Sequence, residues 1–200
     1  MAIKPILFNT EMVRAILDGR KSCTRRPIKF PEGQTGRLPA CGDRKYIFYP
    51  NGIKYPPYHP GDILYVRETW HKYTKRVGEG ENCHLAEFYG YKASVANSED
   101  ADEPWKPSIH MSKEAARIWL KVTDVRAERL LEITEDEIAR EGIKPRFDLK
   151  DKFSSDIAKG RFLELWNSTI KKSDRDRYGW DASPWVWVIE FERCEKPEIL

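Results

Sequence analysis

The chain has 200 residues, of which 40% are hydrophobic and 12% aromatic, with seven tryptophans. This composition can bury a sizeable core, so it predicts one globular domain and argues against disorder. The formal net charge of +3 does not by itself indicate a nucleic-acid partner, because 34% of the residues are charged and a small excess can lie anywhere on a solvated surface.

The sequence favours a cytoplasmic location. No apolar run approaches the length of a membrane span, and the start of the chain lacks the apolar segment and small-residue cleavage site of a secretory signal. The absence of any CxxC pair argues against a zinc ribbon and a disulfide framework. We expect reduced thiols at Cys23, Cys41, Cys83 and Cys194. Basic residues surround Cys23, and nearby positive charge lowers the pKa of a thiol, so a lowered pKa at Cys23 stays an alternative.

In chain order, the first expected elements are a short strand at residues 5–8 and a helix between Thr10 and Gly19. Thr10 is the expected N-cap, one face of the helix is apolar, and Gly19 is a typical C-terminal stop. The basic segment GRKSCTRR, residues 19–26, therefore begins where a helix ends. Its backbone donors and side chains can converge on a ligand there, although a solvated basic turn is the simpler interpretation.

Further along, Pro60 and Gly61 predict a turn, and residues 71–104 are polar chain with one strand inside. A capping box of Thr134 and Glu137 predicts a second helix that ends before a glycine. The remaining expected elements are, in order, a small hairpin within residues 45–53, strands at 63–69, 85–93 and 117–125, helices at 134–141 and 156–171, and a strand at 185–194.

Strands outnumber helices in this order, which predicts an α+β fold: a small β-barrel or a curled mixed sheet with flanking helices. Trp185 and Trp187 lie two apart on the last strand and share a sheet face, most simply as core. We expect no metal and no nucleotide cofactor. Neither GxGxxG nor GxxxxGK[ST] occurs, and the four histidines lie far apart without metal-ligand spacing.

Four blocks, which cover roughly half of the chain, resemble one family. They are residues 16–26, residues 60–64, residues 134–141 and the closing strand WVWVIEF. Together they look like the ASCH domain family of the PUA-like superfamily. The chain also resembles a longer subgroup, common in phages and prophages, that carries the stretch 105–111; Ser112 stands where that subgroup usually has proline.

The resemblance implies one ASCH-like domain over residues 1–200, with insertions at about 31–57, 71–104 and 144–180. It also implies a small β-barrel with a cleft beside the exit of the first helix, and the handling of RNA or modified nucleosides. Small bacterial ASCH proteins that resemble this chain are amidohydrolases acting on N4-acetylcytidine, with a lysine, a threonine and a glutamate as catalytic group.

Matched motif to motif, that catalytic group falls on Lys21, Thr24 and Glu141, and we expect the three side chains to converge in one cleft. Amide hydrolysis needs a nucleophile, a base and donors for an oxyanion. Thr24 can supply the hydroxyl. Nearby arginines favour a neutral Lys21 that can act as base, whereas the carbonyls at the helix end favour a charged one, and the sequence leaves this open. The simpler alternatives are an exposed Glu141 and a strand residue Thr24 that bonds locally.

Two sets of residues are candidates for substrate binding. The arginines Arg20, Arg25 and Arg26 can hold a phosphate or a sugar. Trp105 and His110 lie on a proline-containing loop, where an aromatic ring can stack on a base or close the end of the barrel.

The sequence favours a hydrolase that removes an acyl group from the exocyclic amine of a cytidine-type nucleoside or base. A non-catalytic module that binds RNA or reads a modified base stays open, since the same arginines can grip a backbone without cleavage. A nuclease is a third, less favoured interpretation. The expected partner is a modified nucleoside or RNA, not a membrane or a metal.

Overall fold

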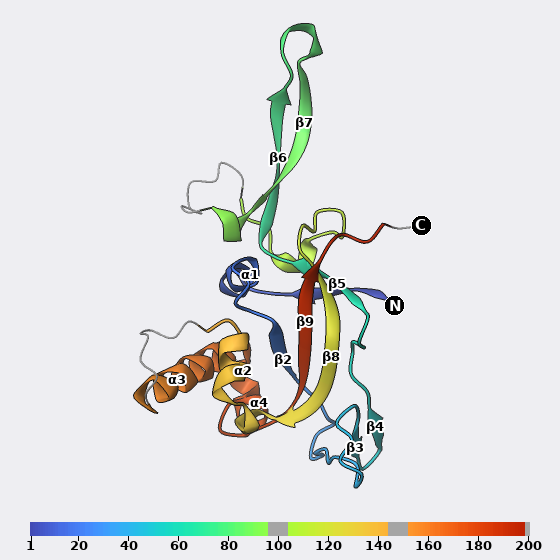
Figure 1. Ribbon diagram of the computed structural model, residues 1–200, viewed down its shortest axis with the longest axis vertical. Helices are drawn as coiled ribbons and strands as arrows, with labels where there is room; N and C mark the ends of the chain where they lie inside the picture. The colour runs from blue at the N-terminus through green and yellow to red at the C-terminus, as the bar shows by residue number, and fades with distance from the viewer. Residues whose placement is uncertain (96–103, 144–151, 199–200) are drawn as a thin grey trace.

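The computed structural model describes residues 1–95, 104–143 and 152–198 and has an α+β fold (Figure 1). A five-stranded mixed sheet forms its centre. In spatial order the strands are β1 (Ile3–Leu7), β5 (Ile63–Arg67), β8 (Trp119–Arg129), β9 (Trp185–Cys194) and β2 (Cys23–Pro27). β1 and β5 are parallel, and the other neighbours are antiparallel. In the described part of the chain β1 and β2 are the two edges, so the curled mixed sheet is confirmed and a closed barrel is not formed.

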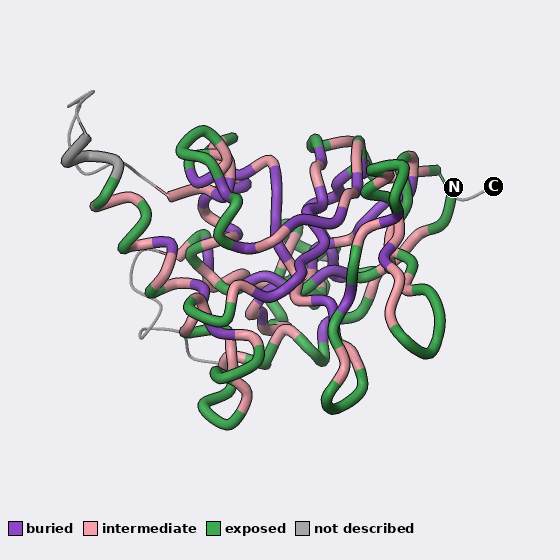
Figure 2. The backbone as a smooth tube through the Cα atoms, turned by 90° about the horizontal axis from the view of Figure 1, so that it is seen from below, coloured by how far each residue is buried: buried purple, intermediate pink, exposed green. Residues whose placement is uncertain are grey.

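The strand β9 separates two hydrophobic cores. Trp185 and Trp187 are buried in the core that also contains residues of β1 and α1 (Thr10–Leu17), which confirms their prediction as core. Val186 and Val188 point to the other face and pack against residues of the C-terminal helices. Successive residues of a strand face opposite sides, so a strand covered on both faces reads as a continuous apolar run. Figure 2 shows the buried residues gathered along the central strands, with exposed residues in the surrounding loops.

Three further helices and several single turns complete the chain. The helices are α2 (Glu135–Arg140), α3 (Lys152–Thr169) and α4 (Arg175–Tyr178). The turns are η1 (Gly80–Asn82), η2 (Lys92–Ser94), η3 (Ser108–His110), η4 (Leu130–Glu132) and η5 (Lys172–Asp174). No helix within the described residues is both long and apolar enough to cross a membrane.

The sequence predicts an N-cap for two helices, and the structure agrees with the expected cap at α2 and differs from it at α1. The predicted capping box at α2 is present: Thr134 accepts from the amide of Glu137, whose carboxylate accepts from that of Thr134. At α1 the N-cap is Asn9, whose Oδ1 accepts from the amide of Met12 at 2.9 Å, so the expected cap Thr10 is wrong. Both residue types suit the position, and the extended backbone at Asn9 decides between them.

Two small sheets lie outside the central one. The first is β3 (Ile47–Tyr49) with β4 (Gly52–Lys54), as the expected hairpin requires. The second is β6 (Trp70–Val77) with β7 (His84–Tyr91), a long hairpin that projects from the rest of the molecule (Figure 1). The sequence predicts only its second strand. β6 reads as polar chain because half of it is exposed and only its first residue is buried, so no alternation of apolar and polar residues marks it.

The predicted turn residue Asp62 also fastens the start of the chain. Its carboxylate accepts from Lys4 Nζ at 2.9 Å, from the amide of Ala2 at 2.8 Å and from the amide of His59 at 3.1 Å. Burial alone would raise the pKa of Asp62, but these hydrogen bonds lower it from 3.8 to about 2. The ionised carboxylate therefore stabilises the folded state.

Asp62→Asn should lower the free energy of unfolding by about 2 kcal/mol at neutral pH, because a pKa lowered by folding contributes stability above the unfolded value. That contribution is present above about pH 4 and is lost as the pH falls towards 2, so the difference between variant and wild type should shrink over this window. Urea unfolding at several pH values measures it, with the exposed Asp156→Asn as control. A difference that stays constant from neutral pH to pH 2 would contradict this assignment.

Candidate functional site

The end of α1 and the end of α2 are joined by the backbone of the basic segment. Gly19 has φ +72°, the left-handed conformation that ends many helices. The amide of Lys21 then donates to Ala15 O at 3.0 Å, and the amide of Ser22 donates to Arg140 O at 2.9 Å. Lys21 also forms an antiparallel bridge with Glu141, the C-cap of α2. Two segments 120 residues apart are thereby held side by side.

Lys21 and Glu141 form a buried ion pair. Lys21 Nζ lies 2.6 Å from Glu141 Oε2 and 3.0 Å from Glu141 O. The side chains are 0% and 3% exposed. The ring centroid of Phe8 lies 5.7 Å from Lys21 Nζ. Water is excluded from such a pair, so the low dielectric strengthens the contact and makes either group costly to leave alone.

Arg25 contacts the other oxygen of this glutamate. Its guanidinium lies 3.3 Å from Glu141 Oε1, 3.0 Å from a carboxylate oxygen of Glu137 and 3.5 Å from one of Glu128. The Arg25 side chain is 1% exposed. Its Nε is buried without a hydrogen-bond partner among the described residues. The guanidinium is therefore held inside the protein by three carboxylates.

A second group of charges, which the sequence analysis misses, fixes those carboxylates. Arg126 contacts Glu128 at 2.6 Å, Glu137 at 2.8 Å and Glu190 at 2.6 Å. Burial would lower the pKa of Arg126, but hydrogen bonds to Glu190 and Glu128 raise it above its usual value. Glu128 lies on β8, Glu190 on β9 and Glu137 on α2, so the register of β8 with β9 and the position of α2 together bring these partners to Arg126.

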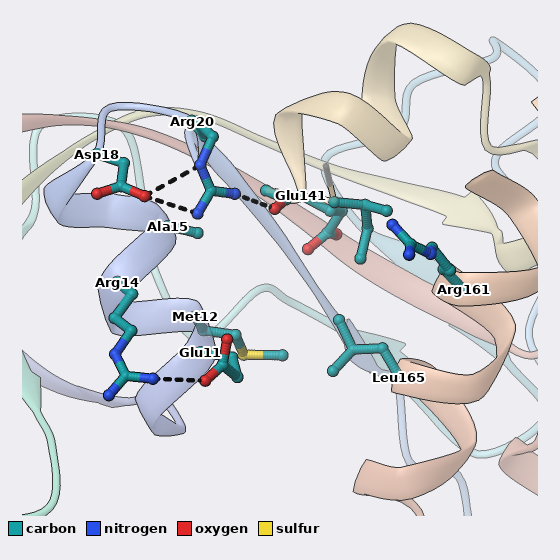
Figure 3. Close-up of a pocket in the computed structure, with 11 residues that line it drawn as sticks. Glu11, Met12, Arg14, Ala15, Asp18, Arg20, Glu141, Arg161 and Leu165 are labelled. Carbon is teal, nitrogen blue, oxygen red and sulfur yellow. Dashed lines mark hydrogen bonds and ion pairs between the residues drawn. The ribbon is translucent and has the colours of Figure 1, made fainter. Parts of the chain in front are cut away.

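Two cavities meet at Glu141. We call the larger the outer chamber; it has a volume of about 350 Å³ and lies between α1, the end of α2 and α3 (Figure 3). The smaller, the inner chamber, has about 20 Å³ and is lined by Thr24 and by residues of α3. Met12, Glu141 and Leu165 line both. Thr24 and Glu141 thus share the inner chamber, and Lys21 is bonded to Glu141.

Two of the predicted substrate-binding residues, Arg20 and Arg26, line different chambers. Arg20 lines the outer chamber and bonds Asp18 and Gly142 O (Figure 3). Arg26 lines the inner chamber and donates to Leu7 O at 2.7 Å.

Trp105 and His110 line neither chamber. The Trp105 ring packs against His71 at the base of the long hairpin, with 4.5 Å between centroids, and His110 lies in η3. The structure therefore does not bring these two residues to the Lys21–Glu141 pair, and their stacking role stays a prediction.

The lowered pKa considered for Cys23 is wrong. Burial, and after it the negative charge of Glu141, raise the pKa of this thiol to about 12. The cations Lys21 and Arg25 act in the opposite direction but do not outweigh burial. Cys23 is therefore a neutral thiol that fills space beneath α2, with its Sγ 3.8 Å from Glu137 O.

Gly142→Ala should disturb both the fold and the site. Gly142 has φ +90°, and a Cβ there would lie 2.6 Å from Ala15 Cβ and 3.1 Å from Lys21 Cβ. The strained backbone and the clash together should lower the free energy of unfolding by about 2–4 kcal/mol. Thermal unfolding measures this. Gly160→Ala in α3 is the control, because a Cβ meets nothing there and alanine suits a helix. Equal melting temperatures for the Gly142 variant and wild type would contradict the prediction.

The described residues contain no group of three or more histidine, cysteine, aspartate or glutamate side chains arranged to hold a metal ion. Among known proteins, no family model and no curated protein matches the chain. One solved structure, an ASCH domain from Lactobacillus crispatus JV V101, is similar over 96% of this chain and 79% of its own, with 10% sequence identity and a TM-score of 0.40.

Proposed function

We propose that the protein is a hydrolase that removes a small acyl group from the exocyclic amine of a cytidine-type nucleoside or base. The observation that carries the proposal is the buried contact of 2.6 Å between Lys21 and Glu141, placed where the outer chamber meets the inner chamber that Thr24 lines. The resemblance of the sequence to ASCH amidohydrolases supports the same three residues. Buried titratable groups at a cavity are typical of catalytic sites.

Each residue has a role in the proposed reaction. The hydroxyl oxygen of Thr24 attacks the acyl carbon, the carboxylate of Glu141, which lines the same chamber, takes the hydroxyl proton, and the carbonyl electrons move onto oxygen. The ammonium of Lys21, 2.6 Å from Glu141 Oε2, holds that carboxylate in place. Arg25 lines the inner chamber, and its Nε–H lacks a hydrogen-bond partner among the described residues, so we assign it to the developing oxyanion.

The intermediate then collapses. The carbonyl reforms, the carbon–nitrogen bond breaks, and the leaving amine takes the proton from Glu141. In the second half, Glu141 takes a proton from water as that water attacks the acyl-threonine. When the ester bond breaks, the proton returns to Thr24 and a carboxylic acid is released. The sum is one water consumed for one amide cleaved, and the chain's own groups return to their starting state.

The test is incubation of the protein with N4-acetylcytidine, with cytidine and acetate measured by chromatography. We expect equal amounts of both products. An acetylated exocyclic amine on a purine nucleoside serves as the control for base recognition. If no acylated cytidine is cleaved while a single-stranded oligoribonucleotide binds, the non-catalytic RNA-binding module is the better account.

A further inference from the structure

One side chain from each of two neighbouring helices lines both chambers. Met12 of α1 and Leu165 of α3 point toward one another across the space below Glu141 (Figure 3). Both residues, like Glu141, line the outer and the inner chamber. A group that extends from the outer chamber towards Thr24 therefore lies beside Met12, Leu165 and Glu141.

The inner chamber holds a group of very small size. A cavity needs about 10–15 Å³, in the same measure, to contain one water. The chamber's value of about 20 Å³ therefore leaves room for one water or one methyl group. The outer chamber, with about 350 Å³, is in the range of pockets that hold ligands as large as a nucleoside. The sizes favour the base and sugar in the outer chamber and the methyl end of an acetyl group in the inner one.

The wall behind the inner chamber is fixed. Phe162 and Trp166 line it and are 2% and 5% exposed. The indole of Trp166 donates to Tyr178 O at 2.8 Å, and the ring of Phe162 lies 5.9 Å from that of Trp180. Close-packed side chains of this kind do not shift to admit an extra methylene without strain.

Resting on the proposed hydrolase, we infer that the inner chamber makes the protein selective for acetyl over longer acyl groups, with Leu165 as the residue that sets the limit. Met12 is unbranched and has rotatable bonds, so it can move aside. Leu165 is branched and stands on the helix that also carries the fixed wall, next to Trp166. Shortening Leu165 should therefore open the chamber.

The experiment compares N4-acetyl-, N4-propionyl- and N4-butyrylcytidine with wild type, Leu165→Ala and Met12→Ala. For wild type, kcat/KM should fall about tenfold or more from acetyl to butyryl, the discrimination typical of an added methylene at a fixed pocket wall. Leu165→Ala should accept butyryl within a few-fold of acetyl. Leu163→Ala, the same change in the same helix at a residue that lines neither chamber, should keep the wild-type order. Met12→Ala should also keep the wild-type order, because Met12 can already move aside. Should Leu165→Ala fail to fold, Leu165→Val is the milder shortening and should raise kcat/KM for propionyl relative to acetyl.

Equilibrium binding of the same three compounds to Thr24→Val separates this inference from the proposed function. Tighter binding of acetyl than butyryl, relaxed when Leu165→Ala is added, supports the chamber even if wild type cleaves nothing. Cleavage of all three at similar kcat/KM by wild type, or a length preference that Leu165→Ala leaves unchanged, overturns the chamber and leaves the hydrolase standing. If none of the compounds binds or is cleaved, both proposals fail.

Discussion

Thr24→Val should abolish the release of cytidine from N4-acetylcytidine while the protein stays folded. The substitution nearly preserves the shape of a side chain that is 1% exposed and removes only the attacking hydroxyl. We expect a loss of at least about 10³-fold in kcat, since removing one member of a catalytic unit leaves little more than binding and oxyanion stabilisation. Chromatography gives the rate, and thermal unfolding checks the fold.

The chain offers a matched control for this variant. Thr169 lines the same inner chamber, but its hydroxyl donates to Trp166 O at 2.7 Å and belongs to α3. Thr169→Val should keep most of the turnover. Near-wild-type rates for Thr24→Val would make a water activated by Glu141 the better mechanism.

Lys21→Met and Glu141→Gln should each damage both stability and turnover. Glu141→Gln leaves the buried ammonium of Lys21 without a carboxylate, and Lys21→Met leaves Glu141 with Arg25 as its remaining cation. Loss of one partner typically lowers the free energy of unfolding by about 3–5 kcal/mol. The double variant should lose clearly less than the sum of the singles, since no unpaired charge remains. Turnover of the double variant should be little worse than that of either single.

Urea unfolding and turnover per folded molecule give the two double-mutant cycles. Arg20→Met is the control for a cation at the exposed rim of the outer chamber, where the ion pair with Asp18 is solvated and contributes little to stability. Strictly additive losses of stability for Lys21→Met and Glu141→Gln would contradict a direct interaction between the two side chains.

Local signals predict much of this fold. The capping box at Thr134 is a pattern of neighbouring residues, so the sequence determines where α2 begins. The last strand, residues 185–194, is apolar throughout its first half and agrees in both bounds with β9. The β6 strand carries no such pattern, because a ribbon exposed on both faces needs no apolar alternation.

The candidate site likewise contains residues that the sequence can predict and residues that it cannot. The resemblance of the sequence to ASCH amidohydrolases marks Lys21, Thr24 and Glu141 as candidates, and Lys21 and Glu141 each follow the end of a helix. The partners of Arg25 cannot be predicted in this way, since Glu128, Glu137 and Glu141 reach it only through the pairing of β2 with β9 and the docking of α2. One arginine of the basic segment, Arg25, is thus buried in the fold.

The inner chamber also cannot be predicted from the sequence. Leu165 recurs at helical spacing in α3, which marks it only as an apolar residue of a helix. Its place between two cavities depends on how α3 lies against α1, a long-range arrangement without a local signal.

The most direct test of the central claim is mass spectrometry of the peptide that contains Thr24, after rapid acid quench of wild type mixed with N4-acetylcytidine. A covalent nucleophile predicts one acetyl group on Thr24 in the early samples, with a burst of cytidine equal to the protein present. The Thr24→Val protein should show neither. Cytidine release in which the acetyl group lies on another residue, or repeated turnover by Thr24→Val, would contradict the account.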